Sequence, residues 1–476
     1  MPRLSRMTLD RLDPAVARPG YARDEQAIGI VHLGIGAFHR AHQAAYTDAA
    51  MAAGDRDWAI AGVSLRSAGV RDALVPQDSL YTLTERGAQA PRVALIGAIR
   101  DVIVAPEAPA AVTALIAAPA TRIVTLTVTE KAYFGRPDGS LDIAAVQAAG
   151  QTIFHHLAAG IAQRRASGAP GLTIVSCDNL AHNGALLHRR LAAWLDRVDN
   201  ATRDWFEREC ACPATMVDRI VPAVDAATRD DVAAAIGVYD AAAIVTEPFH
   251  QWVIEDRFAG ARPRWEVAGA QFVGDVAAFE RAKLRMLNGA HSALAYLGLL
   301  AGHTFVHEAV ADTAIAPVVE RLMRQEAAAS LATERGSGGG IDARDYADRL
   351  LQRFRNPGLP HRLSQIATDG SQKIPQRWLE PMAANARAGR SSPATLRALA
   401  AWLLHIRGDG APVSDPLAAP LAALWAQAGS TGIAEALFAE GGLLAGQWHP
   451  NATDLALLRQ EMSDLDAPPP VRHHDG

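Results

Sequence analysis

The feature that most constrains the fold is a short apolar run that ends in two closely spaced glycines. Residues 27–33 have the length and composition of a buried strand. Gly34 and Gly36 follow directly, and residues 41–53 are compatible with a helix. A strand, a glycine turn and a helix in this order favour a Rossmann-type dinucleotide-binding domain, whose turn lets the backbone approach a pyrophosphate at a helix N-terminus.

The glycine turn departs from the usual fingerprint at its third position, where His39 stands in place of a glycine. Taken alone, the motif leaves open a plain tight turn between a strand and a helix. Arg40 would either add a cation beside the phosphates or lie on the surface as a solvated residue. The cofactor-binding candidates around the turn are Gly34, Gly36, Ala37, Phe38 and Arg40.

A second predicted strand, residues 58–64, ends where such folds read the adenosine ribose of the cofactor. NAD-specific domains usually carry an acidic residue at this point, and this chain has Arg66 there instead. An arginine would accommodate the 2′-phosphate of NADP, or would simply be a surface residue. NAD is the expected cofactor, and NADP stays open.

The first half of the chain alternates between predicted strands and helices. Further strand candidates lie at residues 93–99, 122–128 and 172–176, with helical stretches between them. This alternation predicts an α/β fold with a mostly parallel sheet and covering helices.

Polar residues follow two of these predicted strands. Glu130 and Lys131 come after one strand, and Asp178 and Asn179 come after the other. Because ligands bind at the carboxyl ends of strands in open α/β sheets, all four are candidates for substrate or cofactor contact. The alternative for each is a loop-forming or helix-capping residue, and for Asp178 we favour that alternative.

Two later segments are also dense in polar residues. Asp218 and Arg219 lie in a proline-flanked segment, where they would contact a ligand or pair with each other on a surface. Residues 244–256 mix a short strand with charged and aromatic side chains. Such density beside a sheet indicates the edge of a site more than a solvated face.

The pattern becomes helical after a last predicted strand at residues 267–273. We therefore expect a Rossmann-type NAD(P)-binding domain at 1–273 and a mostly α-helical substrate and catalytic domain at 274–476. The clearest helical patterns of the second domain lie at 312–332 and 393–405.

Three segments are expected to lack regular structure. Residues 1–26 predict an irregular leader, and residues 336–340, which contain four glycines, predict a flexible loop. The proline-rich tail from residue 467 onward is expected to be disordered.

Composition excludes several classes of function. A net charge of -5 gives no electrostatic basis for binding nucleic acid or an anionic membrane. Residues 290–301, the most apolar stretch, are too few to span a bilayer. Three cysteines, without a matching pair of ligand motifs, predict a reducing, cytoplasmic location and no metal site.

The segment with the densest chemistry is KLRMLNGAH, which runs from Lys283 to His291. On an α-helix, Glu280, Asn288 and His291 lie about 60°, about 140° and about 80° from Lys283, within one half of the surface. Two leucines fall in the same sector, so the pattern indicates a polar cluster in an apolar wall. The alternative is an exposed Glu280–Lys283 pair and a core histidine.

Such a cluster matches the needs of alcohol oxidation. Moving a hydride from a secondary alcohol to a nicotinamide also requires removal of the hydroxyl proton, which a lysine with a lowered pKa can accept. Amide donors such as Asn288 would stabilise the developing oxyanion, and His291 would position the substrate hydroxyl or relay a proton. Glu280 would connect the base to solvent or form only an ion pair with Lys283.

Several motifs together resemble the mannitol dehydrogenase and fructuronate reductase family, the polyol-type long-chain dehydrogenases. They run in family order from about residue 30 to residue 377 and are specific as a set. The matching segments are IVHLGIGAFHRAHQAAYTD, TLTVTEKAY, SCDN with the NG after it, TMVDRI, EPFHQWVIED, KLRMLNGAHS and DGSQKIPQR.

The resemblance implies a fold, an activity and a set of roles. It implies a Rossmann-type domain, a helical C-terminal domain and zinc-independent, NAD(P)-dependent oxidation of a CH–OH group. The family's general base matches Lys283, and the acidic residue beside it matches Glu280. Its oxyanion-binding asparagines match Asn179 and Asn288, its substrate-positioning histidine matches His291, and the aspartate of its VDRI motif matches Asp218.

The substrate is less constrained than the reaction type. DGSQKIPQR and the segment around Lys283 are similar to the fructuronate reductase branch, whereas HNG after SCDNLA is similar to the mannitol branch. Arg285, Lys373 and Arg377 are cations that would hold the carboxylate of a sugar acid. Fructuronate reduction to D-mannonate is therefore expected first, and mannitol oxidation to fructose second. A dinucleotide sensor without catalysis would not need Lys283, Asn288 and His291.

Overall fold

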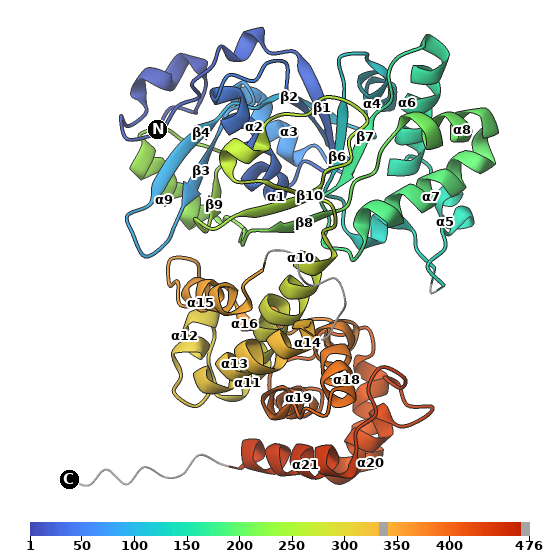
Figure 1. Cartoon of the computed structure of the whole chain (residues 1–476). Coiled ribbons are helices and arrows are strands. Elements are labelled where there is room, and N and C mark those ends of the chain that lie inside the picture. Colours follow the sequence, from blue (N-terminus) through green and yellow to red (C-terminus); the bar gives the residue numbers. More distant parts are fainter. Residues whose placement is uncertain (137, 333–340, 468–476) are drawn as a thin grey trace. The chain divides into compact units, whose positions relative to one another are not determined.

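The computed structural model describes residues 1–136, 138–332 and 341–467. Within it the chain divides into two compact units, Met1–Ala277 and Ala278–Gly476, which carry different kinds of structure (Figure 1). Each unit is described separately below. The predicted glycine loop at 336–340 and the predicted tail from residue 468 onward lie outside the described residues.

A five-stranded parallel sheet forms the centre of the first unit. Its strands are β1 (Ile28–Leu33), β2 (Ala59–Ser64), β5 (Ile99–Val104), β6 (Ile123–Leu126) and β7 (Thr173–Ser176). The order across the sheet is β5-β2-β1-β6-β7, and every neighbouring pair is parallel. The order reverses direction at β1, so the switch point lies between β1 and β6, where ligands bind in open α/β sheets. The predicted parallel sheet is confirmed.

The sheet is buried on both faces, as a parallel sheet requires. Val31 and Leu33 pack into an apolar core with helices α4 (Pro109–Ala117) and α6 (Ile153–Ser167). Ile30, on the opposite face of the same strand, belongs to a second core that includes residues of helix α2 (Gln43–Ala52). Near-continuous apolar strands such as β1 follow from this two-sided burial.

The remaining helices of the first unit lie between the strands in sequence (Figure 1). They are α1 (Ala37–Ala41), α3 (Gly69–Leu74), α5 (Ile143–Ala149), α7 (Asn183–Val198), α8 (Asn200–Glu209) and α9 (Ala226–Ile236). The helix predicted at 41–53 starts earlier, at Ala37, and is interrupted at His42, whose backbone is non-helical (φ -118°, ψ -88°).

Two three-stranded sheets complete the first unit. One has the order β4 (Arg92–Ile96), β3 (Tyr81–Glu85), β9 (Ile244–Thr246). The other has the order β11 (Gln271–Val273), β10 (Gln251–Glu255), β8 (Thr215–Asp218).

Two predicted strands differ from the structure. The strand predicted at 93–99 is correct only over 93–96, because β4 ends at Ile96 and β5 begins at Ile99 in a different sheet. Gly97 turns the chain between them, with its N–H bonded to Asp48 and its carbonyl to Arg23. The strand predicted at 267–273 is correct only in its second half, because a 3₁₀ turn occupies Trp265–Ala268.

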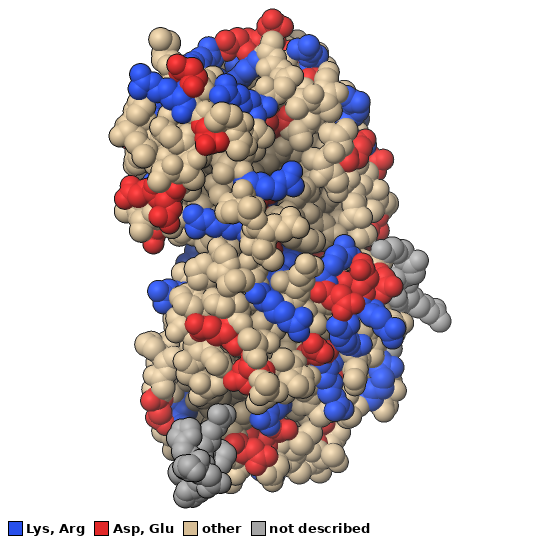
Figure 2. Space-filling model, turned by 90° about the vertical axis from the view of Figure 1, so that its left-hand side faces the viewer, with Lys and Arg blue, Asp and Glu red and all other residues tan. Residues whose placement is uncertain are grey.

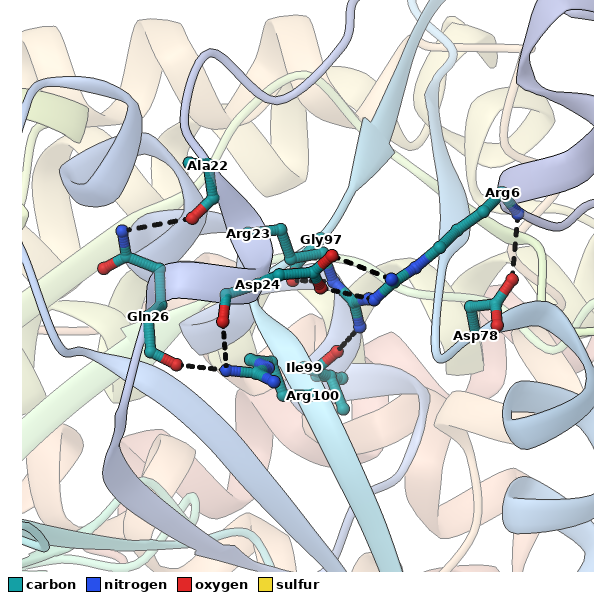
Figure 3. A network of polar contacts seen from close by, with 9 residues as sticks. All are labelled: Arg6, Ala22, Arg23, Asp24, Gln26, Asp78, Gly97, Ile99 and Arg100. Carbon is teal, nitrogen blue, oxygen red and sulfur yellow. Dashed lines mark hydrogen bonds and ion pairs between the residues drawn. The ribbon is translucent and has the colours of Figure 1, made fainter.

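The leader is more ordered than predicted. It contains 3₁₀ turns at Arg6–Arg11 and Arg23–Glu25, and Leu4 and Leu12 are buried. It also covers the open edge of β4 through a bridge between Ala17 and Ala94. Figure 3 shows the polar contacts that fix it, which are Arg6 with Asp24 and Asp78, Arg23 with Gly97 and Ile99, and Arg100 with Asp24 and Gln26.

The second unit is helical and has one large apolar core. Helix α11 (Gly289–Leu300) packs against α19 (Pro393–His405), which is buried along most of its length and has the bounds predicted from sequence. The other helices are α10 (Ala277–Ala282), which crosses the boundary between the units, α12 (Val306–Ala311), α13 (Ala316–Arg321), α14 (Ala328–Ala332), α15 (Ala343–Phe354), α16 (Leu363–Ile366), α17 (Gly370–Ile374), α18 (Glu380–Arg387), α20 (Ala418–Phe438) and α21 (Ala452–Asp466).

Three of its helical runs contain a π-helical turn, namely Lys283–Asn288, Leu322–Ala327 and Pro375–Leu379. The helix predicted at 312–332 begins later, at Ala316. Its pitch changes within its length because of the π-helical turn at Leu322–Ala327. Such turns are rare and frequently mark functional sites.

Candidate active site

The glycine turn has the geometry that a dinucleotide pyrophosphate requires. Gly34 has a φ of +97°, and a Cβ there would meet the carbonyl oxygen of Thr127 at 2.2 Å, so only glycine fits. Gly36 precedes α1, and a Cβ there would meet only the Gly34 oxygen, at 3.8 Å. The space beside Gly36 is therefore open to an approaching group. Ala37 and Phe38 form the first turn of α1 and are partly buried.

His39, at the position of the third glycine, stacks on His32 in the interior of the first unit. Its ring is fully buried and lies parallel to that of His32, with centroids 3.4 Å apart. His32 in turn hydrogen-bonds the hydroxyls of Thr125 and Thr127, at 2.7 and 2.9 Å. Burial lowers the pKa of His32 to about 3 and holds that of His39 well below its usual value, so both rings are neutral near pH 7.

Arg40 is a buried structural residue, so the solvated surface position is wrong. Its Nη1 donates to the carbonyl of Ala242 at 2.6 Å, and its guanidinium lies over the ring of Tyr81. Arg66, by contrast, is exposed just after β2, where a cofactor ribose would be read. Asp218 is buried at the end of β8, so the surface pair with Arg219 is wrong as well.

Arg219 instead joins three segments inside the first unit. Its guanidinium pairs with Glu85 at 2.5 Å and donates to the carbonyls of Ala41 and Glu247, at 2.5 and 3.1 Å. Glu247 belongs to the polar segment predicted to edge a site, and its carboxylate accepts from the N–H of Ile220. The TMVDRI and EPFHQ motifs thus hold each other and the end of α1 in place.

The end of β6 lies directly against the glycine turn. The hydroxyl of Thr127 donates to the carbonyl of Gly34 at 2.8 Å. Glu130 and Lys131 follow in a 3₁₀ turn, Glu130–Tyr133, and both are exposed. The two candidates therefore stand next to the predicted cofactor position and are accessible to a ligand.

Asn179 lies in the loop after β7, which is held by hydrogen bonds of Asp178 and Asn183. Asp178, which precedes it, is buried and accepts bonds from the N–H groups of Val128 and Thr129. Asn183 is fully buried and donates to the carbonyls of Asp178 and Thr215, at 3.1 and 2.9 Å. Asn183 was not predicted as a functional residue, although the NG pair after SCDN indicates it. Gly184 follows because a Cβ there would meet the Ala214 nitrogen at 2.5 Å.

In the second unit, Lys283 and Asn288 begin and end a π-helical turn, so the regular α-helix predicted for this segment is wrong. Gly289 N–H, for example, donates to Leu284 O, five residues earlier. Because the π pattern joins residues five apart, Lys283 and Asn288 lie about one turn apart on nearly the same side. Regular α-helix geometry would separate them by about 140°. Glu280 lies just before this turn, on α10, and is partly buried.

His291, one turn later on α11, packs against residues that no local pattern connects to it. Its ring centroid lies 4.7 Å from that of Phe354 and 5.6 Å from that of His361. Burial lowers the pKa of His291 well below its usual value, and nearby His361, Arg353, Arg377 and Lys283 lower it further. Among the described residues, His291 Nε2 and His361 Nδ1 have no hydrogen-bond partner.

The three predicted carboxylate-binding cations have different contacts in the structure. Lys373 donates to the carbonyls of Ile366 and Thr368, at the C-terminal end of α16, which gives it a capping role. Arg285 is buried and donates to Ser330 at 3.2 Å.

Arg377 remains beside the Lys283–His291 segment. Its Nη1 donates to the carbonyl of Asn288 at 3.3 Å and to the hydroxyl of Ser292 at 2.8 Å. Burial lowers the pKa of Arg377 to about 10, so it stays a cation near pH 7.

The described residues contain neither a metal-binding cluster nor a membrane-spanning helix. No group of three or more His, Cys, Asp or Glu residues there is arranged to hold a metal ion. The same residues include no helix that is long and apolar enough to cross a membrane. On the face drawn in Figure 2, basic and acidic side chains are interspersed.

Comparison with known families accounts for both units. Residues 28–267 match the model of the mannitol dehydrogenase Rossmann domain, and residues 275–445 match that of the mannitol dehydrogenase C-terminal domain.

Individual relatives cover nearly the whole chain. It is 38% identical to D-mannonate oxidoreductase of Escherichia coli K12, over 92% of this chain and 93% of that protein. It is 40% identical to mannitol 2-dehydrogenase of Pyrenophora tritici-repentis, over 86% of this chain and 75% of that protein. A solved structure of Pseudomonas fluorescens mannitol 2-dehydrogenase with NAD and D-mannitol has a TM-score of 0.83 at 35% identity, covering 97% of this chain and 96% of that one. The chain therefore belongs to the mannitol dehydrogenase family of oxidoreductases.

Proposed function

We propose that this enzyme is an NAD-dependent, zinc-independent dehydrogenase that interconverts fructuronate and D-mannonate. In the reductive direction a ketone on a sugar-acid chain becomes a secondary alcohol. The ketone carbon gains a hydride, and the carbonyl oxygen gains a proton. The cysteines are free thiols, in keeping with a cytoplasmic enzyme.

The first unit would hold the cofactor. The nicotinamide coenzyme, when bound, would accept or donate the hydride. The open approach at Gly36 and the positive φ of Gly34 suit its pyrophosphate, and Ala37 and Phe38 extend that surface. Arg66 stands exposed where the adenosine ribose would lie, so NADP is a second coenzyme to test.

Lys283 would move the proton. As an ammonium it donates a proton to the developing alkoxide, and as an amine it accepts the proton in the oxidative direction. The side-chain amides of Asn288 and Asn179 would donate hydrogen bonds to the same oxygen and stabilise its charge. Glu280 would pass protons between Lys283 and solvent, and His291 would bind a substrate hydroxyl.

The observation that favours a sugar acid is the positive charge gathered around His291. Lys283, Arg353 and Arg377 all lie close enough to lower the pKa of its imidazole. A guanidinium stabilises a bound carboxylate by paired, charge-assisted hydrogen bonds, and a polyol carries no such group. The match to D-mannonate oxidoreductase over 93% of that protein agrees with this preference.

Mannitol 2-dehydrogenase activity is the second candidate. It is favoured by the 40% identity to a fungal mannitol 2-dehydrogenase and by the likeness to the bacterial enzyme solved with D-mannitol. In that case the substrate would be D-fructose in the reductive direction, with the same roles for Lys283 and the two asparagines.

A coenzyme oxidation assay of the purified protein separates these candidates. It follows the absorbance of NADH, and separately of NADPH, with fructuronate, tagaturonate and fructose. We expect the highest kcat/KM with fructuronate and NADH. A kcat/KM for fructose equal to or above that for both uronates would assign the enzyme to the polyols, and turnover of none of the three would reject both candidates.

A further inference from the structure

Thr129 has a backbone conformation that a threonine rarely adopts. Its φ is 72° and its ψ is 159°, a region that is essentially restricted to glycine. It lies between the end of β6 and the 3₁₀ turn that carries Glu130 and Lys131. Non-glycine residues persist in this region only where their surroundings hold them, and such places cluster at active sites.

The group that holds Thr129 is the carboxylate of Asp178. Asp178 Oδ1 accepts from the N–H groups of Val128 and Thr129, both at 2.8 Å. Its Oδ2 accepts from the hydroxyl of Tyr133, the last residue of the 3₁₀ turn, at 2.7 Å. One side chain on the β7 loop therefore fixes both ends of the β6 loop.

The hydrogen bonds of Asp178 lie next to the candidate cofactor-binding and catalytic residues. Thr127, at the start of the same loop, contacts the glycine turn through its hydroxyl and the carbonyl of Gly34. Asn179, which would bind the substrate oxygen, is the residue after Asp178. A movement of the Asp178 side chain would therefore displace the loops after β6 and β7, which lie beside the switch point.

We propose that Asp178 is a positioning residue, whose carboxylate holds Thr129 in its strained conformation and so fixes the β6 loop and Asn179 for turnover. The proposal rests on the proposed function for its kinetic readout. Its physical content is a coupling between Asp178 and the backbone angle of Thr129, which can be measured independently.

The test uses the full-length enzyme with four changes, namely D178A, D178N, D178A/T129G and D178A/T129A. We expect D178A to lower kcat at least thirtyfold, while the Kd for NADH, measured by fluorescence titration, changes less than threefold. That split arises because Gly34 is held separately, by its N–H bond to Val63. D178N should lower kcat less than fivefold, since its Oδ1 still accepts both amides and its NH₂ can donate to Tyr133.

The double variants examine the strain itself. Glycine adopts the observed angles without cost, so D178A/T129G should recover at least tenfold in kcat over D178A. D178A/T129A removes the same hydroxyl without that freedom and should recover nothing. Equal activity of the two double variants, or a D178N as slow as D178A, would overturn the proposal. If D178A does not fold, D178S takes its place, because a serine is too short to reach both amides.

Hydrogen exchange separates this proposal from the proposed function. Even if the wild type reduced none of the sugars, D178A should speed exchange of the Val128 and Thr129 amides at least tenfold, and D178N should not. Unchanged exchange at these two amides in folded D178A would reject the bridge.

Discussion

The imidazoles of His291 and His361 meet edge to face, with ring centroids 5.6 Å apart and planes at 84°. His361 lies just before α16, and its carbonyl is fixed by the N–H of Val306 at 3.0 Å. One ring nitrogen of each histidine, Nε2 and Nδ1 respectively, is buried and has no partner among the described residues. Two neutral imidazoles in this arrangement are suited to adjacent hydroxyls of a sugar chain.

His361→Phe should therefore weaken substrate recognition while it preserves the ring packing. Loss of one hydrogen bond to a substrate hydroxyl costs roughly 1–1.5 kcal/mol, so kcat/KM should fall about tenfold. Steady-state kinetics with the best sugar measures the fall, and His449→Phe, at an exposed histidine, is the control. An unchanged kcat/KM with a lowered melting temperature would make His361 a packing residue.

Lys283→Ala should remove most of the turnover and leave NADH binding intact. General acid–base catalysis contributes roughly 10²- to 10⁴-fold, and kcat should fall within that range. Lys283→Arg should be equally slow, because a guanidinium keeps the charge but does not release its proton near pH 7. If either variant turned over sugar at close to the wild-type rate, Lys283 would not be the base.

The fold could be predicted from the sequence where a single strand or turn depends on its own residues. Gly34 is required by its own φ and by the nearness of Thr127, and the apolar run of β1 reports burial on both faces. The strand predicted at 93–99 ends at Ile96 because Asp48 and Arg23, far away in sequence, bind Gly97 and turn the chain there.

The candidate site was less predictable because its neighbours come from distant segments. His361 and Arg353 reach His291 only once the helical domain has folded, so their spacing in the sequence does not predict that they lie close to it. The π-helical turn also escaped prediction, since an α-helical period was assumed across Lys283–Asn288. Lys373 was predicted as a substrate ligand from its charge, and its contacts with the end of α16 favour a capping role instead.

Arg353→Gln should separate sugar acids from polyols. Arg353 lies near the end of α15, close enough to His291 to lower its pKa. A hydrogen bond to a charged group contributes roughly 1.5–3 kcal/mol, so kcat/KM for fructuronate should fall by about tenfold to a hundredfold. Turnover of fructose should change less than threefold. Arg355→Gln is a matched control, because Arg355 is exposed and lies 3.6 Å from Glu320. Equal losses for both sugars would show that Arg353 does not recognise the carboxylate.

Asp48→Asn should remove a pH dependence from the stability of the first unit. Burial raises the pKa of Asp48 from 3.8 to about 6, and its Oδ1 accepts from Tyr21 Oη and Gly97 N. Because the folded pKa is raised, the folded state favours the protonated acid. Stability is then highest below pH 4 and falls by about 3 kcal/mol as pH rises through 6.

Asparagine keeps the acceptor oxygen and never ionises, so Asp48→Asn should gain on the wild type as pH rises. Thermal melting from pH 4.5 to 8 measures the difference between the two proteins, with Asp230→Asn at an exposed position as the control. We expect the Asp48→Asn enzyme to melt at least as high as the wild type at pH 8 and to lose this advantage near pH 4.5. A difference that stays constant with pH would mean that Asp48 does not titrate in this range.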